Sequence, residues 1–307
     1  MKIRVIVNPK AGAGSAGSKV PELTRAFERR GRQSEIVQTR AAGDAVRLAR
    51  EARADGVELL VVVGGDGTVN EVSRAYVDES GAPLEGPHLG VVPAGTGGDF
   101  RKSFDISKDV DAAVSRMLDS APRPLDLGIL EVCGDDGGPV VTTFVNIASF
   151  GISGRIDRLV NESPKWMGGR LAFFVGTLRA MSTYRNAPVS VRVDGKPWFE
   201  GRMQVVAIAN GRFFGGGMHI APEADPGDGV FDVVVMGDIP FAESLRLAPA
   251  VYKGEHLSEP RVLSTRGSLV EAEPLAPAPV YVDSDGETPG RLPLKARIAR
   301  GALRIRA

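Results

Sequence analysis

A short run of glycines around one acid, Gly64–Thr68, follows directly after the apolar segment Leu59–Val63. Glycines let a backbone approach a phosphate closely, and the N-terminus of a following helix offers N–H groups to an anion. Asp66 stands among these glycines at the carboxyl end of the segment, where open α/β sheets place their ligands. The pattern predicts phosphate binding with an acidic side chain beside the phosphate.

Two further glycine-rich loops follow apolar segments in the same way. Asn8–Ser15 comes after Ile3–Val7, and Pro93–Phe100 comes after Leu89–Val92. The carboxyl ends of neighbouring parallel strands lie at one edge of their sheet. We therefore expect the three loops to converge on one crevice.

Two better-known phosphate-binding motifs match the N-terminal loop, Asn8–Ser15, and the residues after it only in part. Gly12, Gly14 and Gly17 match the dinucleotide-binding pattern GxGxxG, but no acidic residue lies near Gln38 to bind a ribose. The stretch that ends at Lys19 is close to a Walker A loop, but Ser18 stands where the lysine is needed. We therefore favour neither a dinucleotide fingerprint nor a Walker A loop.

The segments that must position these loops alternate between strand and helix patterns over residues 1–125. The expected strands are Ile3–Val7, Glu35–Gln38, Leu59–Val63 and Leu89–Val92, and the expected helices are Pro21–Arg30, Asp44–Asp55, Thr68–Val77 and Asp109–Leu118. A continuous β-branched run such as Leu59–Val63 is typical of a strand buried on both faces. The order predicts a Rossmann-like α/β domain with a parallel sheet covered by helices on both sides.

Residues 126–307 predict a second, β-rich domain, a sandwich. The expected strands are Leu127–Val132, Val140–Ala148, Val189–Val193, Arg202–Ala209, Val230–Met236 and Val280–Val282, and the expected helices are Gly169–Met181 and Phe241–Tyr252. Asp194-Gly195 between two strands indicates a two-residue hairpin. Pro122 and Pro124 mark the expected junction, Glu271–Pro279 is interpreted as a connector, and the last strand is a candidate to return to the first domain.

Composition excludes several classes of protein. Lys and Arg number 38 and Asp and Glu number 38, so the chain lacks the overall positive charge of a dedicated nucleic-acid binder. The single cysteine, Cys133, excludes an internal disulfide framework and a multi-cysteine zinc site, and it suits a reducing compartment. We expect no signal peptide and no membrane span, and therefore a cytoplasmic protein.

Motifs along nearly the whole chain show a family resemblance. They are Asn8-Pro9 with Gly12, Gly64–Thr68 with Asn70-Glu71, Pro93–Thr96 with Asp99-Phe100, Asp126 with Gly128, Asn146 with Gly151, Asn210-Gly211 with Gly215–Gly217, Pro222–Ala224 with Asp228-Gly229, and Asp285–Glu287. In order and spacing the chain resembles the diacylglycerol kinase catalytic domain, in the bacterial soluble branch related to sphingosine and ceramide kinases. The Gly64–Thr68 motif is shared with NAD kinases, whereas the late Asp-Gly-Glu points to the lipid kinases.

The resemblance implies ATP-dependent phosphorylation of the hydroxyl of diacylglycerol or a related lipid alcohol, with Mg²⁺. It implies catalytic roles for Asp285, Glu287 and Asp66, with Asp285 as the general base. The nucleotide-binding residues that it implies are Asn8, Lys10, Gly65, Asp66, Gly67, Thr68, Glu71, Gly95 and Thr96. The metal ligands that it implies are Asp66, Asp99 and Asp126, with a separate structural site at Asp225, Asp228 and the carbonyl of Val230.

One departure from the family keeps other functions open. Gly98 stands where the family usually carries asparagine before Asp99, which removes an amide donor and acceptor from the loop. The alternatives are a ceramide or sphingoid-base kinase, an NAD-kinase-like enzyme, and a nucleotide- or lipid-binding regulator without catalysis.

Residues 155–185 suggest how such an enzyme reaches a lipid. The six basic residues there are Arg155, Arg158, Lys165, Arg170, Arg179 and Arg185, against the acidic Asp157 and Glu162. Apolar side chains such as Trp166 and Phe173 lie among them, an arrangement suited to anionic headgroups. With Phe213-Phe214, this segment predicts a lipid entrance and peripheral membrane association. The expected partners are a lipid substrate at the membrane surface, anionic phospholipid and a second copy of the chain, with no nucleic acid.

Overall fold

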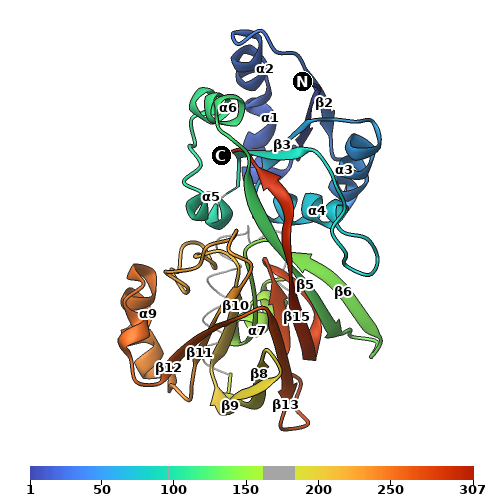
Figure 1. Cartoon of the computed structure of the whole chain (residues 1–307). Helices are drawn as coiled ribbons and strands as arrows, with labels where there is room; N and C mark the ends of the chain where they lie inside the picture. The colour runs from blue at the N-terminus through green and yellow to red at the C-terminus, as the bar shows by residue number, and fades with distance from the viewer. Residues whose placement is uncertain (96, 162–183) are drawn as a thin grey trace.

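The structure is a computed structural model that describes residues 1–95, 97–161 and 184–307. Figure 1 shows an upper part, built mainly from the N-terminal residues in blue and green, and a lower part that holds most of the later strands. The C-terminus lies in the upper part, so the chain crosses to the lower part and returns.

The upper part is a parallel sheet with helices on both faces, as predicted. Its strands are β1 (Ile3–Val7), β2 (Ser34–Gln38), β3 (Leu59–Gly64) and β4 (His88–Pro93). Its helical segments are η1 (Ala11–Gly14), α1 (Ser15–Ser18), α2 (Val20–Glu28), α3 (Asp44–Ala54), α4 (Asp66–Ser73), η2 (Arg74–Tyr76), α5 (Asp99–Ser103) and α6 (Val110–Asp119). β1 pairs in parallel with β2 and β3, and β3 pairs in parallel with β4.

Strand β3 is buried on both faces because successive side chains point to opposite sides of the sheet. Leu60 and Val62 pack in a cluster with Leu48 of α3. Val61 packs in a second cluster with Phe27 of α2. The continuous β-branched run is therefore explained by two helical layers, one on each side.

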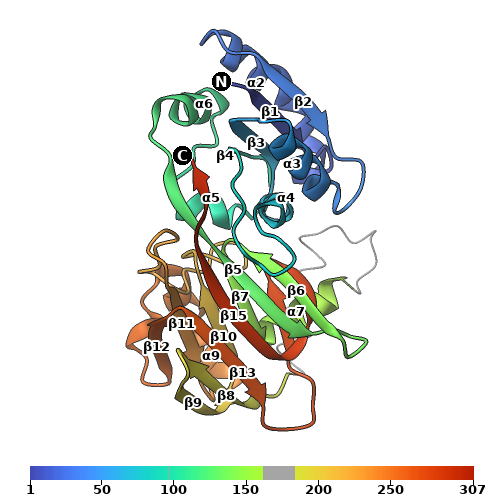
Figure 2. The ribbon, with the colours of Figure 1, turned by 45° about the vertical axis from the view of Figure 1, so that its right-hand side comes forward.

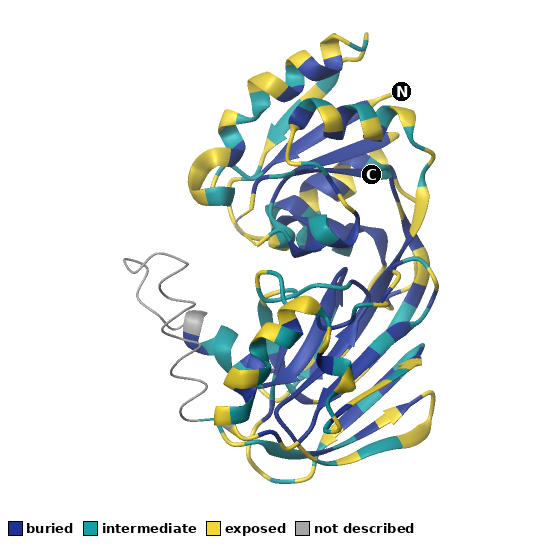
Figure 3. Cartoon of the chain, turned by 90° about the vertical axis from the view of Figure 1, so that its left-hand side faces the viewer, coloured by how far each residue is buried: buried dark blue, intermediate teal, exposed yellow. Residues whose placement is uncertain are grey.

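The lower part is β-rich, as predicted. Its strands are β5 (Arg123–Cys133), β6 (Pro139–Phe144), β7 (Ile147–Gly151), β8 (Ala187–Val193), β9 (Lys196–Met203), β10 (Val205–Ala209), β11 (Phe231–Met236), β12 (Val262–Gly267), β13 (Leu269–Pro274), β14 (Tyr281–Ser284) and β15 (Glu287–Ile305). Its described helical segments are α7 (Ile152–Asn161), α9 (Phe241–Lys253) and η4 (His256–Ser258). Figure 3 shows buried strands at the centre of both parts.

Strand β15 ties the two parts together. It pairs with β5, β13 and β14 in antiparallel fashion, and its last residue, Ile305, pairs in parallel with Leu89 of β4. Leu294 packs in the core of the lower part and Leu303 in a core of the upper part. The described strands thereby join in one 15-stranded sheet with the main order β12-β11-β10-β7-β14-β15-β4-β3-β1-β2. Figure 2 shows β5 and β15 running together between the parts.

Two single strands predicted from the sequence are wrong, because each is divided. The prediction Val140–Ala148 covers β6 and β7, which are separated at Val145 and Asn146 where the backbone N–H groups turn toward Asp285. The prediction Arg202–Ala209 covers the end of β9 and all of β10, which are separated at Gln204.

Other differences concern segments rich in proline and glycine. The interpretation of Glu271–Pro279 as a connector is wrong at its start, since β13 extends to Pro274. The hairpin at Asp194-Gly195 is confirmed by positive φ angles of 49° and 75°. The expected helix Gly169–Met181 lies outside the described residues. The expected domain boundary at residue 125 stays a prediction, and β5 runs through it.

The position of β15 in two cores predicts that both ends of the strand stabilise the protein. Leu294→Ala and Leu303→Ala remove side chains that are 4% and 2% exposed. Each should lower the free energy of unfolding by about 2–5 kcal/mol in urea denaturation followed by circular dichroism. Leu275→Ala, at a side chain 49% exposed, should change it by less than about 0.5 kcal/mol. If the Leu303→Ala variant were as stable as the Leu275→Ala variant, the prediction that the end of β15 stabilises the protein would be contradicted.

Candidate active site

The three glycine-rich loops meet at the carboxyl edge of the parallel sheet. A Cβ on Gly95 would lie 2.6 Å from the Cα of Gly65, and a Cβ on Gly12 would lie 2.0 Å from the carbonyl oxygen of Ala94. Real Cβ atoms do not approach so closely, so the loops pack together only because these residues are glycines. The predicted convergence of the loops is therefore present in the structure.

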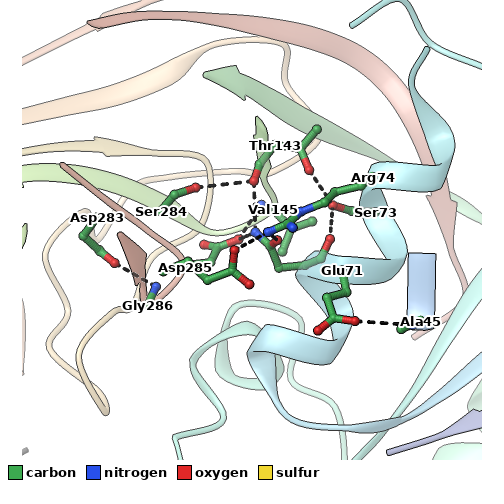
Figure 4. A network of polar contacts seen from close by, with 12 residues as sticks. Ala45, Glu71, Ser73, Arg74, Thr143, Val145, Asp283, Ser284, Asp285 and Gly286 are labelled. Atoms are coloured by element: carbon green, nitrogen blue, oxygen red, sulfur yellow. Dashed lines mark hydrogen bonds and ion pairs between the residues drawn. The ribbon is translucent and has the colours of Figure 1, made fainter. Parts of the chain in front are cut away.

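Asn8 and Thr68 join two of these loops through their side chains. The Asn8 Nδ2 donates to the Thr68 Oγ1 at 3.1 Å, and the Lys10 backbone N–H donates to the Asn8 Oδ1 at 3.1 Å. Gly67 is open, since no described atom lies within 4 Å of the place of its absent Cβ. Glu71 points the other way, toward the backbone N–H of Ala45 at the start of α3, as Figure 4 shows.

Asp66 and Asp99, from two of these loops, are neighbours. The Asp66 carboxylate accepts the backbone N–H groups of Asp99 at 3.1 Å and Phe100 at 3.2 Å. Burial raises the pKa of Asp66, and the neighbouring Asp99 carboxylate raises it further, against the lowering effect of these N–H donors. The Asp99 carboxylate accepts the Lys102 Nζ at 3.0 Å and the backbone N–H of Gly216 at 2.8 Å.

Asp285 lies at the tip of the β14–β15 hairpin. It contacts Asn70 of α4, the helix that begins in the loop Gly64–Thr68. Asp285 and Gly286 have φ angles of 50° and 88°, as a two-residue turn with two left-handed residues requires. The Gly286 N–H donates to the Asp283 Oδ1 at 2.8 Å, which holds the turn. The sequence Asp-Gly therefore fixes the backbone that presents this carboxylate.

Four N–H groups surround the Asp285 carboxylate. The Oδ2 accepts the Val145 N–H at 2.7 Å and the Asn70 Nδ2 at 2.8 Å, and the Oδ1 accepts the Ile147 N–H at 2.8 Å and the Asn146 N–H at 3.1 Å. Burial raises the pKa of Asp285 to about 6, although these donors favour the ionised form. A carboxylate that titrates there is ionised at neutral pH and can still accept a proton.

Glu287, also predicted from the sequence, is paired with a cation. It forms an ion pair with Arg74, whose Nη2 also donates to the Asn70 Oδ1 at 2.8 Å. Figure 4 shows Arg74 and Asp285 approaching from opposite elements. The two acidic residues of the late Asp-Gly-Glu motif thus meet α4 and η2, elements more than 200 positions earlier in the chain.

The other predicted metal ligands lie apart from Asp66 and Asp99. Asp126 accepts the backbone N–H groups of Gly229 at 2.7 Å and Gly301 at 2.6 Å. Asp228 forms an ion pair with Arg266. Within the described residues, no group of three or more His, Cys, Asp or Glu side chains is arranged to hold a metal ion. The roles of Asp126, Asp225, Asp228 and the Val230 carbonyl stay predictions.

Sequence reasoning assigned no role to Arg74, and it missed what Asn70 and Asn146 do. Asn70 and Asn146 enter the sequence analysis only as parts of motifs. The spacing of Asn70 one helical turn after Asp66 is a signal that could have placed Asn70 at the same edge. Arg74 gave no such signal, because its partner Glu287 is distant in sequence. Thr96, a predicted nucleotide ligand, lies outside the described residues.

Comparisons with known proteins match both parts of the chain. The family model described as "Diacylglycerol kinase catalytic domain" matches residues 2–130, and the one described as "YegS C-terminal NAD kinase beta sandwich-like domain" matches residues 146–307. A diacylglycerol kinase of Bacillus subtilis (strain 168) is 30% identical over 297 residues, which cover 95% of this chain and 91% of that protein. The chain belongs to the diacylglycerol kinase family.

One further relative of this diacylglycerol kinase family member is similar over its whole length, and solved structures share its fold. A diacylglycerol kinase of Mycobacterium tuberculosis (strain ATCC 25618 / H37Rv) is 29% identical, with 99% of this chain and 94% of that protein covered. The crystal structure of a diacylglycerol kinase from Bacillus anthracis str. Sterne has a TM-score of 0.70 at 23% identity, over 99% of this chain and 96% of that one. Yeast NADH kinase complexed with NADH shares the fold, with a TM-score of 0.54 at 12% identity.

Membership of the diacylglycerol kinase family makes the chain an enzyme, a lipid kinase that transfers a phosphoryl group to an alcohol. None of its described helices is both long enough and apolar enough to cross a bilayer. Of the predicted lipid entrance, residues 162–183 lie outside the described residues. Phe213 is described and stacks on His219 with ring centroids 4.3 Å apart.

The residues at this site fit the groups that the diacylglycerol kinase family implies. The packed glycines leave backbone and an open Gly67 where phosphates would approach, which suits a nucleotide. Burial and the neighbouring Asp99 carboxylate raise the pKa of Asp66, and a divalent cation with oxygen ligands would offset this cost of ionising Asp66.

The contact between Gly65 and Gly95 generates a prediction for nucleotide binding. A methyl group in Gly95→Ala must push the two loops apart, at a cost of about 1–3 kcal/mol. We expect ATP to bind about ten-fold more weakly or worse in isothermal titration calorimetry. The matched control is Gly17→Ala, at a helical glycine whose Cβ would meet no described atom within 4 Å. Equal ATP affinity in the Gly95→Ala variant and the unsubstituted protein would refute the loop assignment.

Proposed function

We propose that this lipid kinase phosphorylates diacylglycerol or a closely related lipid alcohol with ATP, and that Asp285 is its general base. The observation that carries the proposal is the position of the Asp285 carboxylate. It bonds at 2.8 Å to Asn70 of α4, the helix that starts in the loop Gly64–Thr68. A proton acceptor and the phosphate-binding loops are thereby brought to one edge of the sheet. The relatives named diacylglycerol kinase support the choice of substrate.

In the proposed reaction, the lipid hydroxyl oxygen attacks the γ-phosphorus of ATP, the bond to the β-phosphate oxygen breaks, and ADP leaves. Asp285 takes the hydroxyl proton. Asn8, Lys10, Thr68 and the loop glycines Gly65, Gly67 and Gly95, with Thr96, are proposed to surround the nucleotide. Glu71 is left out of this set because its carboxylate accepts the backbone N–H of Ala45. Asp66 and Asp99 are proposed to hold Mg²⁺, which would neutralise charge on the phosphates.

The four donors around Asp285 set a condition on this step. A carboxylate offers about four lone-pair positions, and four N–H groups fill them in this structure. To accept a substrate proton, Asp285 must lose one of these hydrogen bonds. Three of the donors belong to the backbone at residues 145–147. The fourth is the side chain of Asn70, which is also hydrogen-bonded to Arg74 and to the carbonyl oxygen of Thr143.

A substrate panel tests the proposal directly. Transfer of labelled phosphate from ATP with Mg²⁺ is measured on micelles of diacylglycerol, monoacylglycerol, ceramide and sphingosine, with NAD as the soluble control. We expect label on diacylglycerol and a loss of at least about 100-fold in Asp285→Asn, with ATP binding retained. Label on ceramide or sphingosine alone would make the enzyme a sphingoid lipid kinase, and label on NAD alone would make it a nucleotide kinase. An absence of label on every acceptor, with ATP bound, would favour a regulator.

The pH dependence of kcat/KM tests the role of Asp285 independently. A general base must be ionised, and the pKa of Asp285 lies at about 6. We therefore expect kcat/KM for diacylglycerol to be level above neutral pH and to fall about ten-fold per pH unit below about 6. An acidic limb near pH 4, the ordinary range of an aspartate, would argue that another group accepts the proton.

A further inference from the structure

Arg74 connects the two parts of the molecule at the proposed catalytic carboxylate. It lies in η2, directly after α4, and its Nη2 donates to the Asn70 Oδ1 at 2.8 Å. The same nitrogen forms the ion pair with Glu287 of β15. Arg74 is half-buried, at 29% side-chain exposure, which limits how far water screens this pair.

Asn70 is completely buried and uses both ends of its amide. The oxygen accepts from Arg74, and the nitrogen donates to the Asp285 Oδ2 at 2.8 Å and to the carbonyl oxygen of Thr143 at 3.0 Å. The reverse orientation would aim the amide oxygen at an ionised carboxylate. The contact with Arg74 at the oxygen and the contact with the Thr143 carbonyl at the nitrogen therefore both favour the orientation in which the NH₂ group faces Asp285.

We propose that Arg74, held in place by Glu287, is a positioning residue that fixes the Asn70 amide with its NH₂ group toward Asp285. The inference rests on the proposed role of Asp285 as the base. It also gives Glu287 a function that acts through Arg74 rather than on the substrate. The order of contacts is Glu287, Arg74, Asn70 and Asp285.

The charges around Asp285 make this arrangement important. The charge of Asp66 of α4 raises the pKa of Asp285, and Glu287 follows Asp285 on β15. Asp283 of β14 lies close by, and burial together with Asp157 and Asp285 raises its pKa well above the ordinary value.

Burial raises the pKa of Asp285, and among the groups that lower it the Asn70 amide has the largest effect. Without Arg74, the Asn70 oxygen loses its donor, and only the Thr143 carbonyl and Asp285 itself hold the NH₂ group in place. The amide would then stabilise the ionised form of Asp285 less well, and Asp285 would keep its proton to a higher pH.

The test is the pH profile of kcat/KM on the substrate that the panel identifies. Arg74→Met keeps most of the side-chain length and removes the charge and the donors. We expect its acidic limb to move to higher pH by about one unit, so that activity falls about ten-fold at pH 5.5 and recovers toward the level of the unsubstituted enzyme at high pH. Arg74→Lys should restore part of the shift. A general loss of packing would lower activity equally at every pH.

A double-mutant cycle tests the order of contacts. If Glu287 acts through Arg74, the variant Arg74→Met/Glu287→Gln should be no worse than Arg74→Met alone. Losses that multiply would show that Glu287 acts separately, and they would overturn that part of the inference. The matched control is Arg297→Met, because Arg297 also joins β15 to the upper part, through the carbonyl oxygens of Ser80 and Gly81, away from Asp285. In the Arg297→Met variant, the acidic limb of the pH profile of kcat/KM should stay at the same pH as in the unsubstituted enzyme.

The outcomes separate this inference from the proposed function. Full activity in Asp285→Asn would refute the base itself. Loss in Asp285→Asn with an unmoved acidic limb in Arg74→Met would refute only the positioning role. If Arg74→Met fails to fold by thermal melting, Arg74→Lys and Glu287→Gln take its place, and an unmoved limb in both would overturn the inference.

Discussion

The burial of one carboxylate, Asp285, is the constraint on which the arrangement of the site depends. A buried anion needs hydrogen bonds to offset its lost hydration. Here the backbone N–H groups of residues 145–147 and the amide of Asn70 supply them. The backbone can do so only by leaving the sheet ladder, which is why one predicted strand became β6 and β7. The hairpin tip presents Asp285, and the strand break and α4 supply the hydrogen bonds to its carboxylate.

The long strand β15 stabilises this arrangement of the hairpin, the strand break and α4. It begins at Glu287, directly after the Asp285-Gly286 turn, and ends at Ile305, where it pairs with β4 of the upper part. Residues in its middle and at its end pack in separate cores. A displacement of the hairpin relative to the glycine-rich loops would disturb both cores. The position of Asp285 relative to these loops is thereby set by packing as well as by contacts within the site.

Polar contacts between the upper and lower parts also fix the orientation of side chains at the site. Asp99 joins its own loop to Gly216, and Arg74 joins Asn70 to Glu287. Gly98, where the family usually carries asparagine, adopts a left-handed conformation at the start of α5. The loop is instead held by the Asp66 carboxylate, which accepts two of the following N–H groups. The loss of the amide at position 98 thus leaves Asp99 in place.

Local sequence determined the parts of this protein whose physics is local. The β-branched run of β3, the helices after each glycine-rich loop and the hairpins at Asp194-Gly195 and Asp285-Gly286 follow from side-chain periodicity and from the φ angles that glycine permits. The order of motifs also identified the family. Only the tertiary structure decided the division of β6 from β7, the course of β15 through proline and glycine, and the partners of Asp285 and Glu287. Those features depend on contacts between residues more than 100 positions apart, and neither propensity nor spacing encodes such contacts.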